Sequence, residues 1–118
     1  MDVAETKEYC RSFSGAREEE LGYPRNILSF SVGGKKFAYF KTSEPEQWRF
    51  SVRVSSDRYL ELTDQVGINP ARYMHRFHWI TIVDVGSWPS ELVRELVRWS
   101  YGKAVSGLSK KAREAAGA

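Results

Sequence analysis

The chain has 118 residues, of which 42% are hydrophobic and 14% aromatic, a size and composition typical of one globular domain and unlike a disordered tail. The formal net charge is +3, and the single cysteine, Cys10, excludes both an intramolecular disulfide and a cysteine-rich zinc site. The first residues lack the apolar stretch of a signal peptide, and no apolar run approaches the roughly 20 residues that cross a bilayer. We therefore expect a cytoplasmic protein that does not contact a membrane.

The charge is unevenly distributed along the chain. Residues 1–20 hold three basic and six acidic side chains, a balance of −3, whereas residues 25–58 hold seven basic and three acidic ones, a balance of +4. A basic middle region permits binding of nucleic acid or another anion. It does not require such binding, because surfaces of mixed charge are common.

The first quarter of the chain predicts one helix followed by a loop. Residues 2–12 form an amphipathic pattern in which Val3, Tyr9 and Phe13 share a face at helical spacing. Cys10 falls in the same pattern and is interpreted as a buried, unreactive thiol. Residues 15–26 carry an acidic triplet at 18–20 and are expected to be a solvated loop.

The clearest predicted element is a β-hairpin of residues 27–32 and 35–41. Gly33 and Gly34 lie between the two strands and supply the positive φ angles that a type I′ turn requires. The register set by this turn gives the core-facing pairs Val32 with Lys35, Phe30 with Phe37, and Leu28 with Tyr39. Residues 48–54 alternate apolar and polar side chains, which is typical of a half-buried antiparallel strand.

The second half of the chain predicts two helices around one more strand. Ser56 is expected to cap a helix over residues 57–66 that ends at Gly67. The inner face of this helix is expected to hold Tyr59, Leu60, Leu62, Thr63 and Val66. A strand continues from residue 80 to about 85, and Ser87 is expected to cap a long helix that runs to about residue 106. Residues 110–118 are helix-prone and are expected to fray.

The order of elements, α-β-β-β-α-β-α, predicts a single α+β domain over residues 1–118. We expect a two-layer sandwich in which helices cover one face of an antiparallel sheet. The other face is then open to solvent and carries small and positively charged side chains, namely Ser29, Ser31, Lys36, Ala38, Arg49, Ser51 and Arg53.

Residues 70–79 are the densest chemical cluster in the chain, with both histidines, two arginines and three aromatic rings. His75 and His78 are three residues apart, and no Asp or Glu lies within five residues of either. A zinc site needs three or four ligands, so we expect no metal and no cofactor here. A histidine base also needs a nucleophile, and no glycine-flanked serine accompanies His78, so we expect a protein that is not an enzyme. His78 and Trp79 are interpreted as structural, with the imidazole bonded to the backbone and the indole in the core.

Two functions remain open at this point. The first is DNA binding through basic side chains that neutralise phosphates with little reading of the bases. The candidate residues are Lys35, Lys36, Arg49, Arg53, Arg72, His75 and Arg76. Exposed aromatic rings such as Tyr73 or Phe77 could stack on bases. The second function is an interaction module for a protein partner or a homodimer, in which the open sheet and a Trp48 or Trp88 at the end of an element form the contact.

Three stretches together suggest a family. They are residues 32–38, which read Val-Gly-Gly-Lys-Lys-Phe-Ala; residues 70–79 with Thr81 and Ile82; and Ser87-Trp88-Pro89 followed by Leu96, Ser100, Tyr101 and Val105. In order and spacing they make the chain resemble the MmcQ/YjbR family of small bacterial proteins over about residues 30–105. The family commonly has an Asn-Lys pair where this chain has His75-Arg76.

The resemblance implies a fold like that of frataxin-like and secretion-chaperone-like domains, with two layers and an antiparallel sheet. Members of the family are often called DNA-binding proteins, with a paired-wing arrangement, so the resemblance implies DNA as a partner. It implies no catalytic activity. The change from lysine to Arg76 keeps a positive charge but replaces a point charge with a planar fork.

Overall fold

A computed structural model of the protein describes residues 1–72 and 74–118, with every side chain in those ranges except that of Arg76. Six strands within these ranges form one antiparallel sheet in the order β1-β2-β3-β4-β6-β5. The strands are β1 (Arg17–Leu21), β2 (Ile27–Val32), β3 (Lys35–Lys41), β4 (Phe50–Arg53), β5 (Ile68–Pro70) and β6 (Trp79–Ile82). The predicted hairpin and the strand after it are therefore confirmed.

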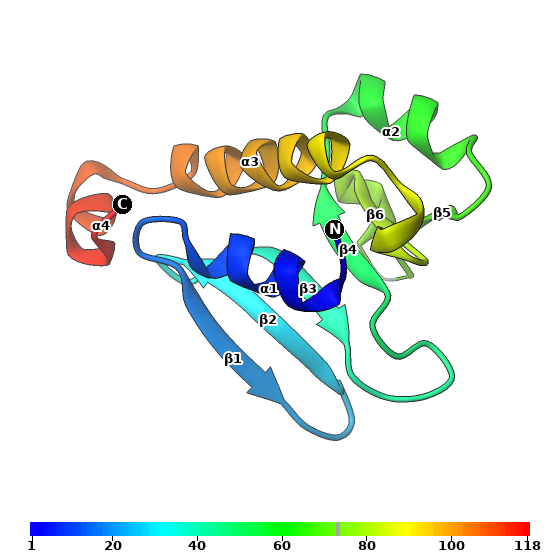
Figure 1. Ribbon diagram of the computed structural model, residues 1–118. Helices are drawn as coiled ribbons and strands as arrows, with labels where there is room; N and C mark the ends of the chain where they lie inside the picture. Colours follow the sequence, from blue (N-terminus) through cyan, green and yellow to red (C-terminus); the bar gives the residue numbers. More distant parts are fainter. Residues whose placement is uncertain (73) are drawn as a thin grey trace.

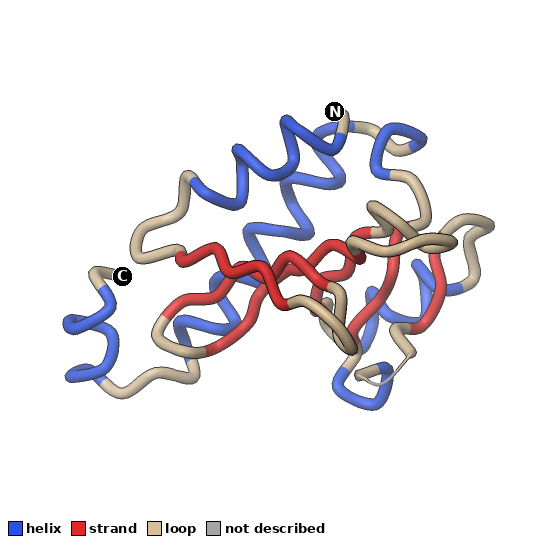
Figure 2. Tube along the Cα trace, turned by 90° about the horizontal axis from the view of Figure 1, so that it is seen from below, coloured by secondary structure: helices blue, strands red, loops and turns tan. Residues whose placement is uncertain are grey.

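The helices lie on one face of this sheet. They are α1 (Val3–Arg11), α2 (Ser56–Thr63), α3 (Ser90–Ser106) and α4 (Lys110–Ala116), with short 3₁₀ turns η1 (His75–Phe77) and η2 (Val85–Ser87). Helix α3 crosses above the strands in Figure 1, and in Figure 2, seen from below, the strands cross in front of it. An ion pair of 3.2 Å between Arg58 and Glu95 ties α2 to α3. The predicted α+β sandwich with one covered face is confirmed.

The hydrophobic core lies between α1, α3 and the covered face. Cys10 from α1 and Val97 from α3 are buried against Phe30, Phe37 and other strand side chains. The predicted inner stripe of α3 is present, because Val93, Leu96, Val97, Ser100 and Ala104 are its buried residues. None of the described helices is long and apolar enough to cross a bilayer.

A β-bulge in β3 changes the register that the turn predicts. Val32 pairs with Lys35 as expected. Farther from the turn, the register shifts between Ser31 and Phe30, so that Phe30 pairs with Ala38 and Leu28 with Phe40. The predicted pairs of Phe30 with Phe37 and of Leu28 with Tyr39 were wrong. A bulge adds one residue to one strand, and with a side-chain period of two this moves every later side chain to the other face. Ala38 therefore faces the core, and Tyr39 lies on the open face.

The hydroxyl of Ser100 closes the gap between β3 and β4 beside the bulge. Ser100 Oγ donates to the carbonyl oxygen of Phe37 at 2.6 Å and accepts from the backbone N–H of Arg53 at 3.1 Å. Both contacts come from α3, so a single buried side chain satisfies two backbone groups and joins the helix to the centre of the sheet.

Three expectations for the chain between these elements were wrong. The acidic residues 18–20 belong to strand β1 and not to a loop, and they occupy the edge of the sheet, where charged side chains stay in water. Leu60 is 73% exposed because it lies on the solvent side of α2, whose buried residue is Leu62, and Val66 is 98% exposed because α2 begins at Ser56, after an N-cap at Ser55, and ends at Thr63. Ser87 lies in η2, and the N-cap of α3 is Pro89.

The C-terminal residues form helix α4, which docks on the start of the chain. Ser109 caps α4, with its side chain accepting from the N–H of Ala112. Gly15, with φ of +74°, makes room for this contact, since a Cβ atom there would lie 2.4 Å from the carbonyl oxygen of Ala116. Figure 1 shows the C-terminus beside the turn between α1 and β1.

The bridge from Ser100 predicts a large cost for its removal. We expect Ser100→Ala to lower the free energy of unfolding by about 1–3 kcal/mol, because the carbonyl of Phe37 and the N–H of Arg53 lose their partner. Urea denaturation of this variant and of Ser106→Ala measures the difference. Ser106 is exposed near the end of the same helix, so its variant is expected to change stability by less than about 0.5 kcal/mol. Equal stability of the two variants would contradict the bridge.

The burial of Cys10 predicts an unreactive thiol. Cys10 is fully buried, and desolvation raises the pKa of its thiol to about 12. Since the thiolate is the nucleophile, roughly one thiol in 10⁴ is ionised at pH 8. We expect a disulfide reagent such as Ellman's to leave the native protein unlabelled over minutes at pH 8 and to label it fully in guanidinium chloride. Equally fast labelling in both states would rule this out.

Candidate functional site

The open face of the sheet is hollowed into a concavity of about 600 Å³, within the range of ligand sites in proteins. Its walls come from the turn between β1 and β2, from the loop between β3 and β4, and from the segment after β5. We call it the basic hollow. The residues that line it are Pro24, Arg25, Ile27, Lys36, Tyr39, Lys41, Glu46, Arg49, Ser51, Arg72, Met74 and Thr81.

The floor of the basic hollow is a row of residues on adjacent strands. Tyr39 pairs with Ser51 across β3 and β4, and Ser51 pairs with Thr81 across β4 and β6. The hydroxyls of Ser51 and Thr81 are hydrogen-bonded to each other at 2.8 Å. Tyr39 reaches this row because of the bulge, and Trp79 packs beside it with ring centroids 5.6 Å apart. The floor is therefore rigid and built from paired strands.

The charge of the basic hollow is strongly positive. Five of its described lining residues are basic, Arg25, Lys36, Lys41, Arg49 and Arg72, and one is acidic, Glu46, which gives a balance of +4. Burial, and to a smaller extent the charge of Arg25, lower the pKa of Lys36 below its usual value. An anion placed in the basic hollow would favour the charged form of Lys36 and so oppose both effects.

Glu46 is bound by two of these cations. Nη2 of Arg72 donates to both carboxylate oxygens of Glu46, at 3.2 and 3.3 Å, and Nη1 of Arg49 lies 3.6 Å from Oε2. Within the described part of the chain, no carboxylate lies within salt-bridge distance of Arg25, Lys36 or Lys41. Lys41 donates instead to the carbonyl oxygen of Arg25 at 2.9 Å.

The structure brings together three of the candidate DNA-binding residues, Lys36, Arg49 and Arg72, and separates others from them. Lys35 lies against the end of α3, where a Cβ atom on Gly107 would be 3.1 Å from the lysine Cε. Arg53 pairs with Trp79 farther along β4, and His75 is exposed in η1, so neither lines the basic hollow. The side chain of Arg76 and all of Tyr73 lie outside the described residues.

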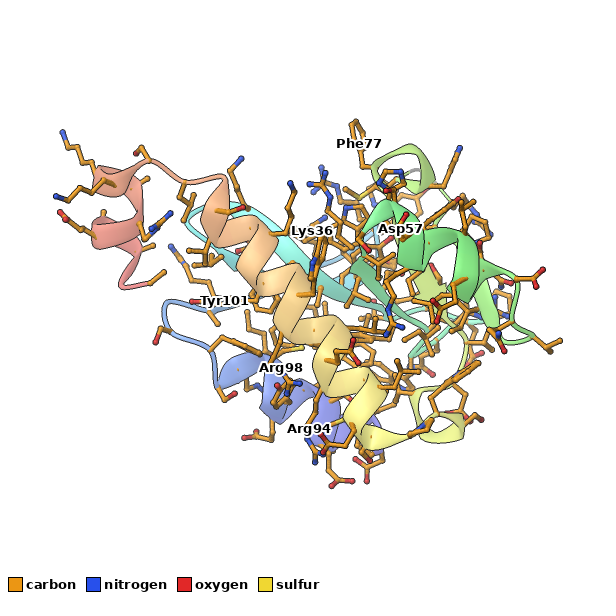
Figure 3. All side chains as sticks on the ribbon, turned by 90° about the horizontal axis from the view of Figure 1, so that it is seen from above. Lys36, Asp57, Phe77, Arg94, Arg98 and Tyr101 are labelled. Atoms are coloured by element: carbon orange, nitrogen blue, oxygen red, sulfur yellow. The ribbon has the colours of Figure 1, made fainter. Side chains whose placement is uncertain are left out.

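The residues after Arg76 hold the end of the sheet. The backbone of His78 adopts φ of +65°, and its carbonyl accepts from the N–H of Val54 at 2.9 Å. Its ring lies 5.5 Å from that of Tyr59 on α2, while Trp79 is only 3% exposed. Phe77 projects from η1 at the margin of the molecule (Figure 3). Trp79 packs on Tyr39, so its indole lies on the side of the sheet away from the helices.

Two cations of the basic hollow, Arg25 and Lys41, were missed by the sequence reasoning. Lys41 shares a face with Tyr39, and the unbulged register places both toward the core. Arg25 lies in a turn, where no periodicity indicates a direction. One signal was available: both residues fall in the stretch 25–58, whose charge balance is +4.

Two other kinds of site were compared with the geometry. Among residues 1–72 and 74–118, no three His, Cys, Asp or Glu side chains gather closely enough to hold a metal ion. A serine nucleophile would need a histidine base beside it. Ser51, on the floor, is 2% exposed, and its hydroxyl is hydrogen-bonded to the hydroxyl of Thr81 and not to a histidine. What the basic hollow can do chemically is to bind an anion.

Fold and site together define a class: a small two-layer α+β domain whose antiparallel sheet is covered by helices on one face and forms a basic concavity on the other. A family model named YjbR matches residues 11–103, and the chain belongs to this family. The resemblance inferred from the three sequence stretches is thereby confirmed.

Known proteins are similar to this chain in sequence, in fold or in both. The YjbR protein of Escherichia coli K12 is 28% identical over 115 residues, which cover 97% of this chain and 96% of that protein. The crystal structure of DR2400 from Deinococcus radiodurans superposes with a TM-score of 0.81 at 27% identity, over 98% of this chain and 88% of that one. A protein from Pseudomonas syringae, at 15% identity and a TM-score of 0.69 over 88% of this chain and 99% of that one, shows the fold alone.

Proposed function

We propose that this protein is a non-enzymatic, cytoplasmic DNA-binding protein that binds weakly, with little dependence on base sequence, through the basic hollow. The observation that carries the proposal is the convergence of five cationic side chains from separate segments on one concave surface, against a single carboxylate among its described residues. Lys and Arg side chains that contact phosphates position a protein on nucleic acid without reading its bases.

The shape of the basic hollow supports contacts to the DNA backbone. A concavity of about 600 Å³ does not enclose a duplex, so the duplex lies across its mouth. Arg25 and Arg72 are exposed and reach phosphates from the rim. Arg49 is half-buried and contacts a phosphate from below, and half-buried Lys36 adds to the positive potential. Such an arrangement favours weak binding that depends strongly on salt.

Two of the basic side chains of α3 make contacts within the protein. Arg94 forms an ion pair of 2.7 Å with Glu91, and Arg98 donates to the hydroxyl of Tyr9 at 3.3 Å. Both arginines extend from α3 toward α1 (Figure 3), on the covered side of the sheet. Because these two arginines are engaged within the protein, they support the open face as the surface for an anionic partner.

A second candidate function is an interaction module for a protein partner or a homodimer. The observation that favours it is the exposure of Leu60 and Val66 on and after α2, where the sequence had predicted buried side chains. Salt separates the two functions, because binding through phosphates weakens steeply between 50 and 200 mM salt, whereas an apolar contact persists or strengthens.

The test compares two double variants that remove the same charge from different places. Arg25→Ala with Arg49→Ala removes one exposed and one half-buried cation from the basic hollow. Lys35→Ala with Arg53→Ala also removes one exposed and one half-buried cation, but both lie outside the basic hollow. In fluorescence anisotropy titrations with duplex DNA, we expect the first variant to weaken binding and to lower the slope of log K against log salt by about 2. The second is expected to keep most of the affinity and slope.

Two results would overturn the proposal. Absence of binding at ~100 μM protein and 50 mM salt, well above usual non-specific dissociation constants, would exclude DNA as the ligand. Equal losses in the two double variants would show that only net charge matters and that the basic hollow is not the contact surface.

A further inference from the structure

The loop between β3 and β4 places one carboxylate where the ligand of the proposed function would bind. Glu46 is the only acid among the described residues that line the basic hollow, and Arg72 binds both of its oxygens. A single nitrogen of Arg72, Nη2, donates to both oxygens, and arginine N–H groups bind phosphate oxygens by the same kind of charge-assisted hydrogen bond. The position of Glu46 is therefore a binding position for an oxyanion.

Contacts made by the two residues Trp48 and Arg49, which follow Glu46, hold the loop around it. Beyond it in the chain, Trp48 donates its backbone N–H to the carbonyl of Lys41 at 2.7 Å, and its ring lies under the ammonium of Lys7, 4.0 Å from the ring centroid. The N–H of Arg49 donates to the carbonyl of Glu46 itself at 3.2 Å. The base of the loop is thus fixed on the core side while its carboxylate lies on the open side.

The ion pairs that hold the carboxylate are exchangeable. The side chain of Arg72 is 65% exposed and that of Glu46 is 28% exposed. Ion pairs in water contribute little to stability, so another oxyanion can replace the carboxylate without unfolding the loop. Arg25, Lys36 and Lys41 also line the basic hollow. They would attract a phosphate as they attract the carboxylate of Glu46.

We propose that Glu46 occupies the phosphate-binding position of the basic hollow, and that a phosphate of the bound nucleic acid replaces its carboxylate between Arg49 and Arg72. This inference rests on the proposed function and adds to it a defined phosphate subsite with an internal competitor. The apparent affinity of a ligand falls by the fraction of time for which its position is unavailable, so Glu46 weakens binding in the wild-type protein.

The test compares Glu46→Gln with Glu44→Gln. Each variant removes one negative charge from the same loop, but Glu44 is exposed and does not line the basic hollow. In anisotropy titrations with duplex DNA at 50 mM salt, we expect Glu46→Gln to tighten binding by about fivefold, the factor that corresponds to one ion pair at the protein surface. Glu44→Gln, whose charge acts only at a distance through salt, is expected to change binding by less than about twofold.

A double-mutant cycle with Arg72 tests the position itself. If the carboxylate and the phosphate compete for Arg72, the gain from Glu46→Gln shrinks when it is combined with Arg72→Ala. A gain of the same size in both backgrounds would mean that Glu46 acts only through its charge, and would overturn the inference.

The outcomes separate this inference from the proposed function. If DNA binds and the two glutamine variants behave alike, the phosphate subsite is wrong while the DNA function stands. If no variant binds DNA, the function is wrong, and inorganic phosphate then decides the subsite. Each variant is titrated with phosphate, with chloride at equal ionic strength as the control, and binding is followed by amide chemical shifts. We expect phosphate to bind Glu46→Gln about fivefold more tightly than Glu44→Gln. Equal binding would exclude the subsite.

Discussion

The junction between the β3 bulge and Ser100 determines which residues this protein presents on each face of its sheet. The extra residue in β3 lets Phe37 and Ala38 both face the core and moves Tyr39 and Lys41 to the open face. A bulge interrupts the ladder of hydrogen bonds between strands. Here the hydroxyl of Ser100 bridges the interruption by bonding Phe37 and Arg53. Without that bridge, two backbone groups at the centre of the fold would lose their partner.

The two faces of the sheet are specialised in opposite ways. The covered face holds the aromatic core of Phe30, Phe37, Phe40 and Phe50 beneath the helices, and burial of this surface supplies the main driving force for folding. The open face gathers cations whose mutual repulsion opposes folding. A sheet with a stable core on its other side can carry such a surface, and the proposed function uses it to bind an anion.

Periodicity predicted the parts of this structure in which one side of an element is buried. The hairpin of residues 27–41, a strand within residues 48–54 and the apolar stripe of α3 are all present, although the hairpin register is shifted and β4 is shorter than predicted, because burial on one face leaves a repeat of two or of about 3.6 residues. Strand β1 could not be found in this way. Its acidic residues lie at a sheet edge, where the strand is held by backbone hydrogen bonds to β2 and its side chains stay in water.

The positive charge of the candidate site could be predicted from the sequence, but the set of residues that form the site could not. The sequence by itself determined the family, the two-layer class and the concentration of positive charge in residues 25–58, since these depend on composition and on local pattern. Only the tertiary structure decided that Arg25, Lys41 and Glu46 belong with Lys36, Arg49 and Arg72, and that Lys35 and Arg53 do not. The physical reason is that the bulge and the Ser100 bridge arise from packing between segments far apart in the chain, and one inserted residue is enough to exchange the two faces of a strand.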